Sequence, residues 1–270
     1  NYMNKVKEFI KEKNLIQNGD HIIIGVSGGA DSVYLLLILN ELRESMNLTI
    51  TAVHINHMIR REAVDDQKFV QDLCGQLLIP CKIFEIDVKQ IAKREKMSLE
   101  EAGRKARYDA FAKTMKKYNA DKIAIAHHQN DQAETVLFQM LRGSSLRGLG
   151  GIRPKRGYII RPLLLCNREE IENSLQEEHI SYCTDQTNGQ NDYTRNAIRN
   201  CIIPAMQKYI QPKAAQHIAK SGMYLQEVME YLTDFELYQE VSVNGKEYLL
   251  VHGGLGNYRK DKDMEEYDLH

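Results

Sequence analysis

A regular alternation of short apolar runs with helical patterns constrains the fold of this chain more than any other feature. The apolar runs all contain isoleucine, as buried strands often do, and they cover residues 22–26, 49–54, 82–86, 122–127 and 158–160. Helical patterns follow the first four runs, over residues 32–46, 62–78, 98–118 and 130–142. Strands that alternate with helices predict an α/β fold, with a mostly parallel five-stranded sheet and helices on both faces.

The pattern changes in the second half of the chain. Helices are expected from residue 167 on and over residues 193–209 and 214–232, and the last 35 or so residues hold an expected strand pair, 237–243 and 248–251. We therefore predict three parts, with boundaries at residues 1–165, 166–232 and 233–270.

Composition excludes several classes of protein. Hydrophobic residues make up 43% and charged residues 27% of the chain, which is typical of a globular protein. No apolar run approaches the roughly 20 residues of a membrane span, and no secretory signal is apparent. The five cysteines form no Cys-x-x-Cys pair, which favours a reducing compartment and a cytoplasmic location over a disulfide scaffold or an iron–sulfur site.

Charge is unevenly distributed although the net charge is only −1. Residues 135–168 contain seven basic residues and no acid, and residues 193–226 contain five more, again without an acid. The stretch between them, 169–192, holds seven acids and no base. Such segregation favours a local positive surface for a polyanion, while solvated helix faces whose charges average out in space remain the alternative.

A glycine-containing loop follows the first expected strand. It reads Ser27-Gly28-Gly29-Ala30-Asp31-Ser32 and opens the first expected helix. Backbone N–H groups at such a place approach an anion closely, the helix dipole adds up to about 1 kcal/mol, and the two serines add hydroxyl donors. The loop lacks the lysine of the Gly-x-x-x-x-Gly-Lys pattern, and Gly-x-Gly-x-x-Gly is absent too. A carboxylate among phosphate ligands implies a bridging cation, so Asp31 predicts Mg²⁺.

This loop resembles the pyrophosphate loop (PP-loop) of ATP-dependent, AMP-forming enzymes. Further strings are similar to signatures of one family among them, the tRNA(Ile)-lysidine synthetases. They are His54-Ile55-Asn56-His57-Met58-Ile59-Arg60, His127-His128-Gln129-Asn130-Asp131-Gln132-Ala133-Glu134-Thr135, and residues 141–149, 185–188 and 193–199. The resemblance covers residues 3 to 232, and Asn130 stands where the family usually has an aspartate.

The resemblance implies a role for each part and for individual residues. Residues 1–165 would be the PP-loop ATP-binding catalytic domain, and residues 166–232 a helical segment that completes the active site and contacts tRNA. ATP would bind residues 27–32 together with His54, Asn56 and His127, and Asp31 would hold Mg²⁺. Catalytic roles fall to Asp31, Arg107 and Arg195, lysine binding to Asp131 and Glu134, and tRNA binding to Arg142, Arg147, Arg153, Arg156 and Arg199.

Two of these assignments also follow from the residues themselves. Asp131 and Glu134 lie three apart at the start of an expected helix, so both carboxylates face one side and suit a cationic substrate, although helix capping is a simpler reading. The basic residues of 142–161 surround glycines that we expect to keep a loop pliable.

The histidines at 54, 57, 127 and 128 lack a thiolate pair or His-Glu-x-x-His spacing, so we do not predict zinc.

For this family the implied reaction is a two-step ligation. The C2 oxygen of the wobble cytidine in the CAU anticodon of tRNA(Ile) attacks the α-phosphorus of ATP, and pyrophosphate leaves. Free lysine then displaces AMP, and the cytidine, unstacked to reach the pocket, becomes lysidine. The partners are therefore tRNA(Ile) and L-lysine, and members of the family are sometimes homodimers.

Three alternatives stay open. The first alternative is another AMP-forming tRNA-modifying enzyme, such as a thiolase, although no Cys-x-x-Cys supports thiolation. The second is an ATP- and tRNA-binding remnant with weak catalysis. The third is a phosphoesterase, because residues 243–255 resemble a fragment of a metallophosphoesterase in which His252 would bind a metal. The partner strings of that family are absent, so we expect no phosphatase activity.

Overall fold

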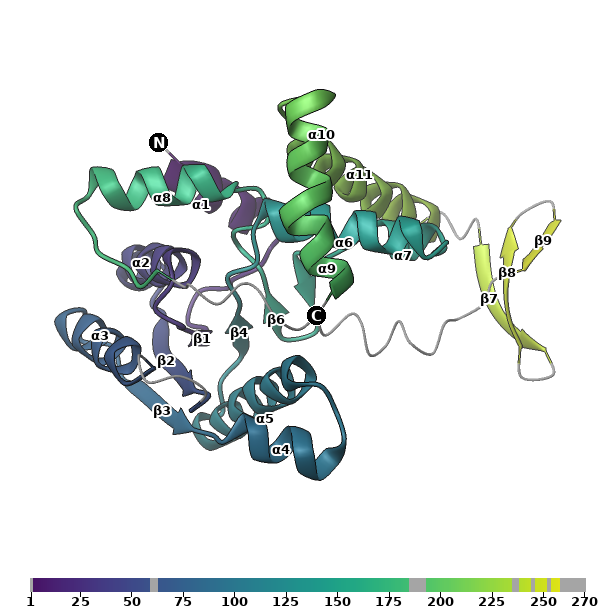
Figure 1. Cartoon of the computed structure of the whole chain (residues 1–270). Helices are drawn as coiled ribbons and strands as arrows, with labels where there is room; N and C mark the ends of the chain where they lie inside the picture. The colour runs from purple at the N-terminus through teal and green to yellow at the C-terminus, as the bar shows by residue number, and fades with distance from the viewer. Residues whose placement is uncertain are drawn as a thin grey trace. The chain divides into compact units, whose positions relative to one another are not determined.

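The computed structural model describes residues 2–58, 63–184, 193–234, 238–243, 246–251 and 254–257. The chain divides into two compact units (Figure 1). The first unit comprises Asn1–Gln129 and Pro154–Asn196, and the second comprises Asn130–Arg153 and Ala197–His270. This division follows backbone proximity and does not test the three-part functional division predicted from the sequence.

The first unit is built on a six-stranded sheet with strand order β3-β2-β1-β4-β6-β5. The strands are β1 (His21–Gly25), β2 (Thr49–Asn56), β3 (Cys81–Glu85), β4 (Lys122–Ala124), β5 (Lys155–Arg156) and β6 (Ile159–Ile160). All neighbours are parallel except β5 and β6. The predicted α/β class with a mostly parallel sheet is therefore confirmed.

The predicted count of five strands is wrong, because β5 is a sixth. It consists of two basic residues, Lys155 and Arg156, and so lacks the apolar run that marks a buried strand. A tight turn through Gly157, at φ 56°, folds it back antiparallel onto β6. These two residues form a strand because the turn brings them alongside β6, at the edge of the sheet.

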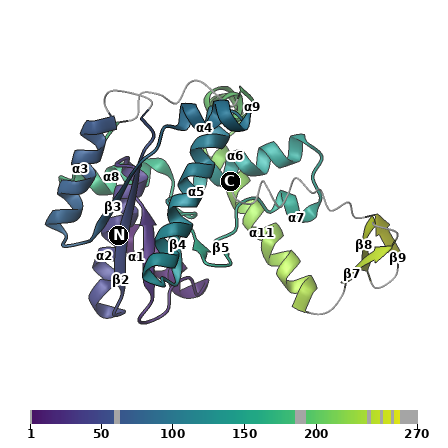
Figure 2. The same cartoon turned by 90° about the horizontal axis from the view of Figure 1, so that it is seen from below.

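Helices cover both faces of this sheet. They are α1 (Tyr2–Glu12), α2 (Ala30–Ser45), α3 (Ala63–Gln76), α4 (Val88–Glu95), α5 (Leu99–Tyr118) and α8 (Arg168–Glu177). Figure 1 shows α2 and α8 on one face and α4 and α5 on the other, and Figure 2 shows α3 and α5 on opposite sides of the strands. Two of these helices, α1 and α4, were not predicted from the sequence.

Local signals explain where α5 begins. The Ser98 side chain accepts a hydrogen bond from the Glu101 N–H at 3.1 Å, and the Glu101 carboxylate accepts one from the Ser98 N–H at 2.7 Å. This reciprocal capping box satisfies two N–H groups that the first turn of a helix leaves without partners. Asn167 and Glu170 form the same arrangement at the start of α8.

The core between α5 and the sheet consists of aliphatic strand residues packed on Phe111. The side chains of Ile22, Ile23 and Ile24 in β1 are fully buried. Gly25 ends β1 directly under the Phe111 ring, where an added Cβ would lie 2.6 Å from Cζ of Phe111. Since real Cβ contacts are not that short, β1 and α5 approach this closely only with glycine at position 25.

The second unit is helical, with a small separate sheet. Its helices are α6 (Gln129–Leu141, whose first residue belongs to the first unit), α7 (Leu146–Leu149), α10 (Ile203–Tyr209) and α11 (Ala214–Asp234). α6, α10 and α11 share a core of Ala133, Leu137, Phe138, Ile198, Ile203, Ala215 and Ala219. A separate antiparallel sheet consists of β7 (Tyr238–Val243), β8 (Lys246–Val251) and β9 (Gly254–Asn257). The predicted strand pair is therefore joined by a third strand. The predicted turn at 244–245 lies outside the described residues.

The helix predicted over residues 193–209 is interrupted by a π-helical turn. α9 (Tyr193–Ala197) is followed by η1 (Ile198–Ile202), and α10 begins with Pro204 in its first turn. A proline in a continuous helix cannot donate to the carbonyl four residues earlier, and its ring crowds that carbonyl. A wider turn ahead of Pro204 relieves this conflict, and such π-turns are frequent at functional sites.

No helix within the described part of the chain is long and apolar enough to cross a membrane.

Candidate active site

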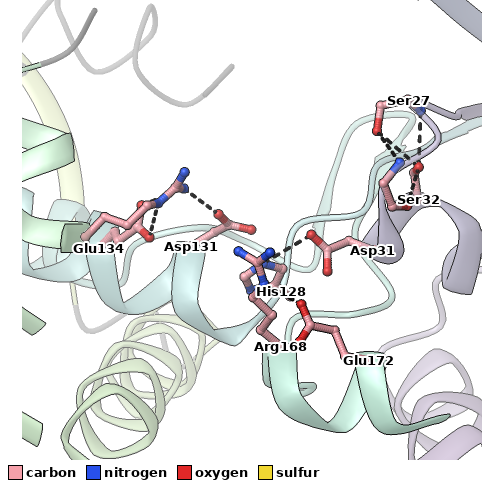
Figure 3. Close-up of polar contacts among 10 residues, drawn as sticks. Ser27, Asp31, Ser32, His128, Asp131, Glu134, Arg168 and Glu172 are labelled. Atoms are coloured by element: carbon pink, nitrogen blue, oxygen red, sulfur yellow. Dashed lines mark hydrogen bonds and ion pairs between the residues drawn. The ribbon is translucent and has the colours of Figure 1, made fainter. Parts of the chain in front are cut away.

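The loop of residues 27–32 connects β1 to α2 and closes on the hydroxyl of Ser32. Ser32 Oγ accepts hydrogen bonds from the N–H groups of Ser27 (3.1 Å) and Gly28 (3.2 Å) and donates to the Gly29 carbonyl (3.0 Å). The Ser27 hydroxyl accepts from the Gly29 N–H at 3.3 Å. Figure 3 shows the two serines turned toward each other at the start of α2. Ser32 therefore shapes the loop, and its predicted direct contact with ATP stays a prediction.

The start of α2 is arranged for an anion. Gly29 is the N-cap residue, and its position has no side-chain capping hydrogen bond. Gly28 has φ +98°, a left-handed conformation that glycine adopts without strain. Backbone N–H groups at an uncapped helix start, next to the positive end of the helix dipole, form an anion site of the kind that phosphates occupy.

Asp31 lies in the first turn of α2 and faces His128. Its Oδ2 atom is 3.4 Å from Nε2 of His128, a buried residue that follows β4 (Figure 3). Its other oxygen, Oδ1, is buried and has no hydrogen-bond partner among the residues that the structure describes. An orphaned carboxylate oxygen beside an anion site fits a divalent cation, which takes oxygen ligands from one carboxylate and from phosphates. His128 was absent from the predicted site residues, although the same string contained it.

His127, predicted to bind ATP, has a different partner. Its Nδ1 atom accepts a hydrogen bond from Nε of Arg161 at 3.2 Å, and Arg161 is only 1% exposed. Arg161 therefore positions His127 from within the core of the first unit.

The end of β2 presents His54 and Asn56. The Nδ1–H of His54 donates to the Val26 carbonyl at 2.8 Å, and burial lowers the pKa of its imidazole. The Asn56 amide donates to Gln67 at 2.9 Å and accepts from the Met58 N–H at 2.9 Å. Both side chains thus fix the shape of the strand end, and their predicted contact with ATP stays a prediction.

A cluster of arginines also belongs to the first unit. Burial lowers the pKa of the Arg104 guanidinium to about 10, and the positive charges of Arg195 and Arg107 lower it further. Arg104, which was not predicted from the sequence, therefore lies close enough to both predicted catalytic arginines for their charges to act on it. Arg104 lies three residues before Arg107 and therefore on the same face of α5, and this spacing could have identified it from the sequence. Like charges held together favour binding of an anion.

The predicted lysine-binding pair lies on α6 in the second unit. Nε of Arg199 donates to Glu134 Oε1 at 2.7 Å, and Nη2 donates to Glu134 Oε2 at 2.9 Å and to Asp131 Oδ1 at 3.3 Å. Both carboxylates therefore face one side of α6, as their spacing predicts. Arg199, which was predicted to contact tRNA, is the cation that they bind in this structure.

The predicted tRNA-binding arginines are distributed over both units. Arg142, Arg147 and Arg153 belong to the second unit, whereas Arg156 lies in β5 of the first. The Arg142 guanidinium stacks over the Phe138 ring, 5.2 Å from its centroid. Their role in tRNA binding stays a prediction.

Buried hydrogen bonds hold the loop around residue 150, and the expectation that its glycines make it pliable stays a prediction. Gln132 donates to the Gly150 carbonyl (2.9 Å) and accepts from the Ile152 N–H (2.5 Å). Gln226 donates to the carbonyls of Gly150 (2.6 Å) and Ile152 (2.7 Å), and all these bonds are buried. A Cβ on Gly151 would lie 2.6 Å from the Gln132 side-chain oxygen. The glycine here permits close approach in a fixed loop.

The predicted metal ligand of the tail, His252, lies outside the described residues. Within the described ranges no group of three or more His, Cys, Asp or Glu residues could hold a metal ion. The resemblance of the tail to a phosphoesterase stays a prediction.

A mostly parallel sheet whose first strand runs into an uncapped, glycine-containing loop at the start of a helix is typical of α/β proteins that bind an anion at this edge of the sheet. The chain belongs to the PP-loop domain family, whose model matches residues 1–206. The PP-loop prediction is thereby confirmed, and membership implies the use of ATP.

Two similar relatives carry the same name. It is 41% identical over 247 residues to the tRNA(Ile)-lysidine synthase of Caldanaerobacter subterraneus subsp. tengcongensis, an alignment that covers 90% of this chain and 53% of the relative. It is 38% identical over 273 residues to the tRNA(Ile)-lysidine synthase of Thermosipho africanus, covering 98% and 62%. The latter alignment therefore extends into residues 233–270. The chain spans about half the length of the curated relatives it matches.

A solved structure confirms the fold. The U34-tRNA thiolase NcsA from Methanococcus maripaludis, solved with its [4Fe-4S] cluster, superimposes with a TM-score of 0.66 at 21% identity, covering 83% of this chain and 78% of that one. At this identity the likeness shows the architecture alone.

Proposed function

We propose that this chain carries the catalytic part of a tRNA(Ile)-lysidine synthetase, which ligates free lysine to C2 of the wobble cytidine in the CAU anticodon of tRNA(Ile). The observation that carries the proposal is the Asp131–Glu134 pair, which already binds a cationic side chain. Its relatives named tRNA(Ile)-lysidine synthase, at 38% to 41% identity, support the same substrate.

The first half-reaction takes place at the PP-loop. The C2 oxygen of the cytidine attacks the α-phosphorus of ATP, the bond to the β,γ-pyrophosphate breaks, and an adenylated cytidine forms. N–H groups at the uncapped start of α2 hold the departing pyrophosphate, and Arg107 and Arg195 offset its charge. Asp31 would hold Mg²⁺ through the otherwise unpartnered Oδ1; when bound, the ion neutralises charge on the phosphate oxygens.

The second half-reaction uses lysine. Asp131 and Glu134 bind and orient the amino acid, whose ε-amine forms the new C–N bond, loses a proton and displaces AMP. In the sequence, Asp131 follows His128, the neighbour of Asp31, by three positions.

Transfer RNA supplies the remaining partner. Arg142, Arg147, Arg153 and Arg156 contact its phosphates, so that affinity falls as salt rises. We place the protein in the cytoplasm because the tRNA that it would modify is found there. Its free cysteines also fit a reducing compartment.

The test is lysine-dependent AMP formation from ATP. We would compare a tRNA(Ile) transcript with a CAU anticodon against the same transcript with its wobble cytidine replaced. AMP that requires both lysine and the wobble cytidine is the expected result. AMP formed without lysine would point to another AMP-forming reaction, and ATP binding without AMP or pyrophosphate to a remnant; either result overturns the proposal.

A further inference from the structure

The side chain of Arg199 lies in the position that a bound ammonium group requires. Its Nη2 nitrogen is 2.9 Å from Glu134 and 3.3 Å from Asp131, so one nitrogen bridges the two carboxylates. An ammonium nitrogen that contacts these same two oxygens would lie near the place that Nη2 occupies. All three residues belong to the second unit.

Burial explains why the carboxylates need a cation at all times. The Glu134 side chain is only 9% exposed, and that of Asp131 is 21% exposed. A buried carboxylate without a compensating cation is costly, and a guanidinium that donates one N–H to each oxygen of Glu134 satisfies it well. Without lysine, a resident cation keeps the pair charged and its carboxylates in place.

Arg199 is also the partner best able to leave. Its side chain is 40% exposed, much more than either carboxylate. It projects from the π-helical turn ahead of Pro204, where the regular α-helical hydrogen-bond pattern is already interrupted. Displacing the guanidinium breaks its hydrogen bonds to Glu134 and Asp131 at a partly solvated site.

We propose that Arg199 is an internal stand-in for substrate lysine: its guanidinium occupies the Asp131–Glu134 pair in the lysine-free protein, and lysine binds by displacing it. This inference rests on the proposed function. The displaced guanidinium then becomes available to a phosphate, the anion that a guanidinium binds best in bidentate fashion. Lysine and tRNA accordingly raise each other's affinity by the same factor, as thermodynamic linkage requires.

The test compares binding of radiolabelled L-lysine to the full chain and to Arg199→Met by equilibrium dialysis. Removal of a competing cation predicts that Arg199→Met binds lysine several-fold more tightly. Arg199→Lys keeps the charge but loses the fork that reaches both oxygens of Glu134, so its affinity should lie between the two. Lys208→Met is the matched control, because it removes one positive charge from α10 of the same unit and lies over Tyr209, so its lysine affinity should not change.

A second readout separates displacement from a purely structural role. Added methylguanidinium should reverse the gain of Arg199→Met by refilling the vacated position, and this reversal should be absent in Lys208→Met at the same concentration. If Arg199 only organises the carboxylates, Arg199→Met binds lysine more weakly, and methylguanidinium strengthens binding. That result overturns the inference.

The outcomes also distinguish this inference from the proposed function. If the unaltered chain forms AMP in a lysine-dependent way while Arg199→Met binds lysine no better, the inference alone fails. If neither the unaltered chain nor Arg199→Met binds lysine, the proposed function fails and the inference falls with it.

Discussion

Oδ2 of Asp31, in the first turn of α2, lies 3.4 Å from Nε2 of His128, the second residue of the pair that follows β4. Two neighbouring strands of the sheet, β1 and β4, thus deliver one carboxylate and one imidazole to the same point at their carboxyl ends. Ligands of open parallel sheets bind at this edge. The contact leaves the second oxygen of Asp31 without a partner in the described part of the chain, so the carboxylate is oriented but not satisfied.

His128→Ala should weaken use of Mg²⁺ and ATP, because Asp31 loses the neighbour that orients it. Loss of such an orienting residue typically costs about 10- to 100-fold in metal affinity or activity. The measurement is the rate of pyrophosphate release as Mg²⁺ is titrated, with recovery expected at high Mg²⁺. His217→Ala, on the exposed surface of α11, is the control. An unchanged Mg²⁺ dependence in His128→Ala would contradict this role.

Asp131→Ala should impair lysine use more than pyrophosphate release. A hydrogen bond to a charged group contributes about 1.5–3 kcal/mol, which corresponds to a rise of roughly 10- to 100-fold in the KM for lysine. Asp109→Ala removes a comparable acid from an exposed i,i+4 pair with Lys105 and should change neither step. Separate assays of pyrophosphate release and of lysine incorporation check this, and equal loss of both would count against the lysine role.

His57→Gln should remove a pH dependence of stability. Burial, followed by the nearby positive charge of Arg107, lowers the pKa of His57 from 6.5 to about 4. Between these two values the unfolded chain binds more protons than the native one, so the free energy of unfolding falls as pH drops through this window and levels off below it. The contribution is at most about 3 kcal/mol.

The measurement is denaturant unfolding of the unaltered chain and of His57→Gln at several pH values from about 7 down to 4.5. The difference between the two isolates His57 from other titrating groups. If the two curves run parallel throughout, His57 titrates normally in the native state and the pKa assignment is wrong.

Gly25→Ala should destabilise the first unit. The new Cβ would lie 2.6 Å from Cζ of Phe111, so β1 or α5 must shift, which typically costs about 1–3 kcal/mol. Gly75→Ala is the matched control: nothing lies within 4 Å of its Cβ, and alanine in α3 should be neutral or stabilise by up to about 1 kcal/mol. Thermal unfolding reports both.

Combining Gly25→Ala with Phe111→Leu identifies the cause. Removal of the ring edge should recover part of the loss, so the two effects should not add. Strict additivity would show that Phe111 is not what excludes a side chain at position 25.

Local patterns explain most of what could be predicted. The capping boxes at Ser98 and Asn167, the loop of residues 27–32 and the isoleucine-containing strands are formed by residues close together in the chain, so spacing alone reveals them. The boundaries at Lys122–Ala124 and at the short β6 were less accurate, because a strand ends where its neighbour stops pairing and not where apolar residues stop.

The sequence by itself determined the α/β class, the position of the glycine-containing loop before α2 and the placement of Asp131 and Glu134 on one helix face, since each depends on residues within a few positions of one another. Only the tertiary structure decided that β5 joins the sheet, that Arg104 stands beside Arg107 and Arg195, and that Arg199 reaches Glu134 across 65 positions of chain. Gln226 likewise fixes Gly150 across 76 positions. Contacts of this kind depend on where the folded backbone brings distant segments together, and no local periodicity encodes that path.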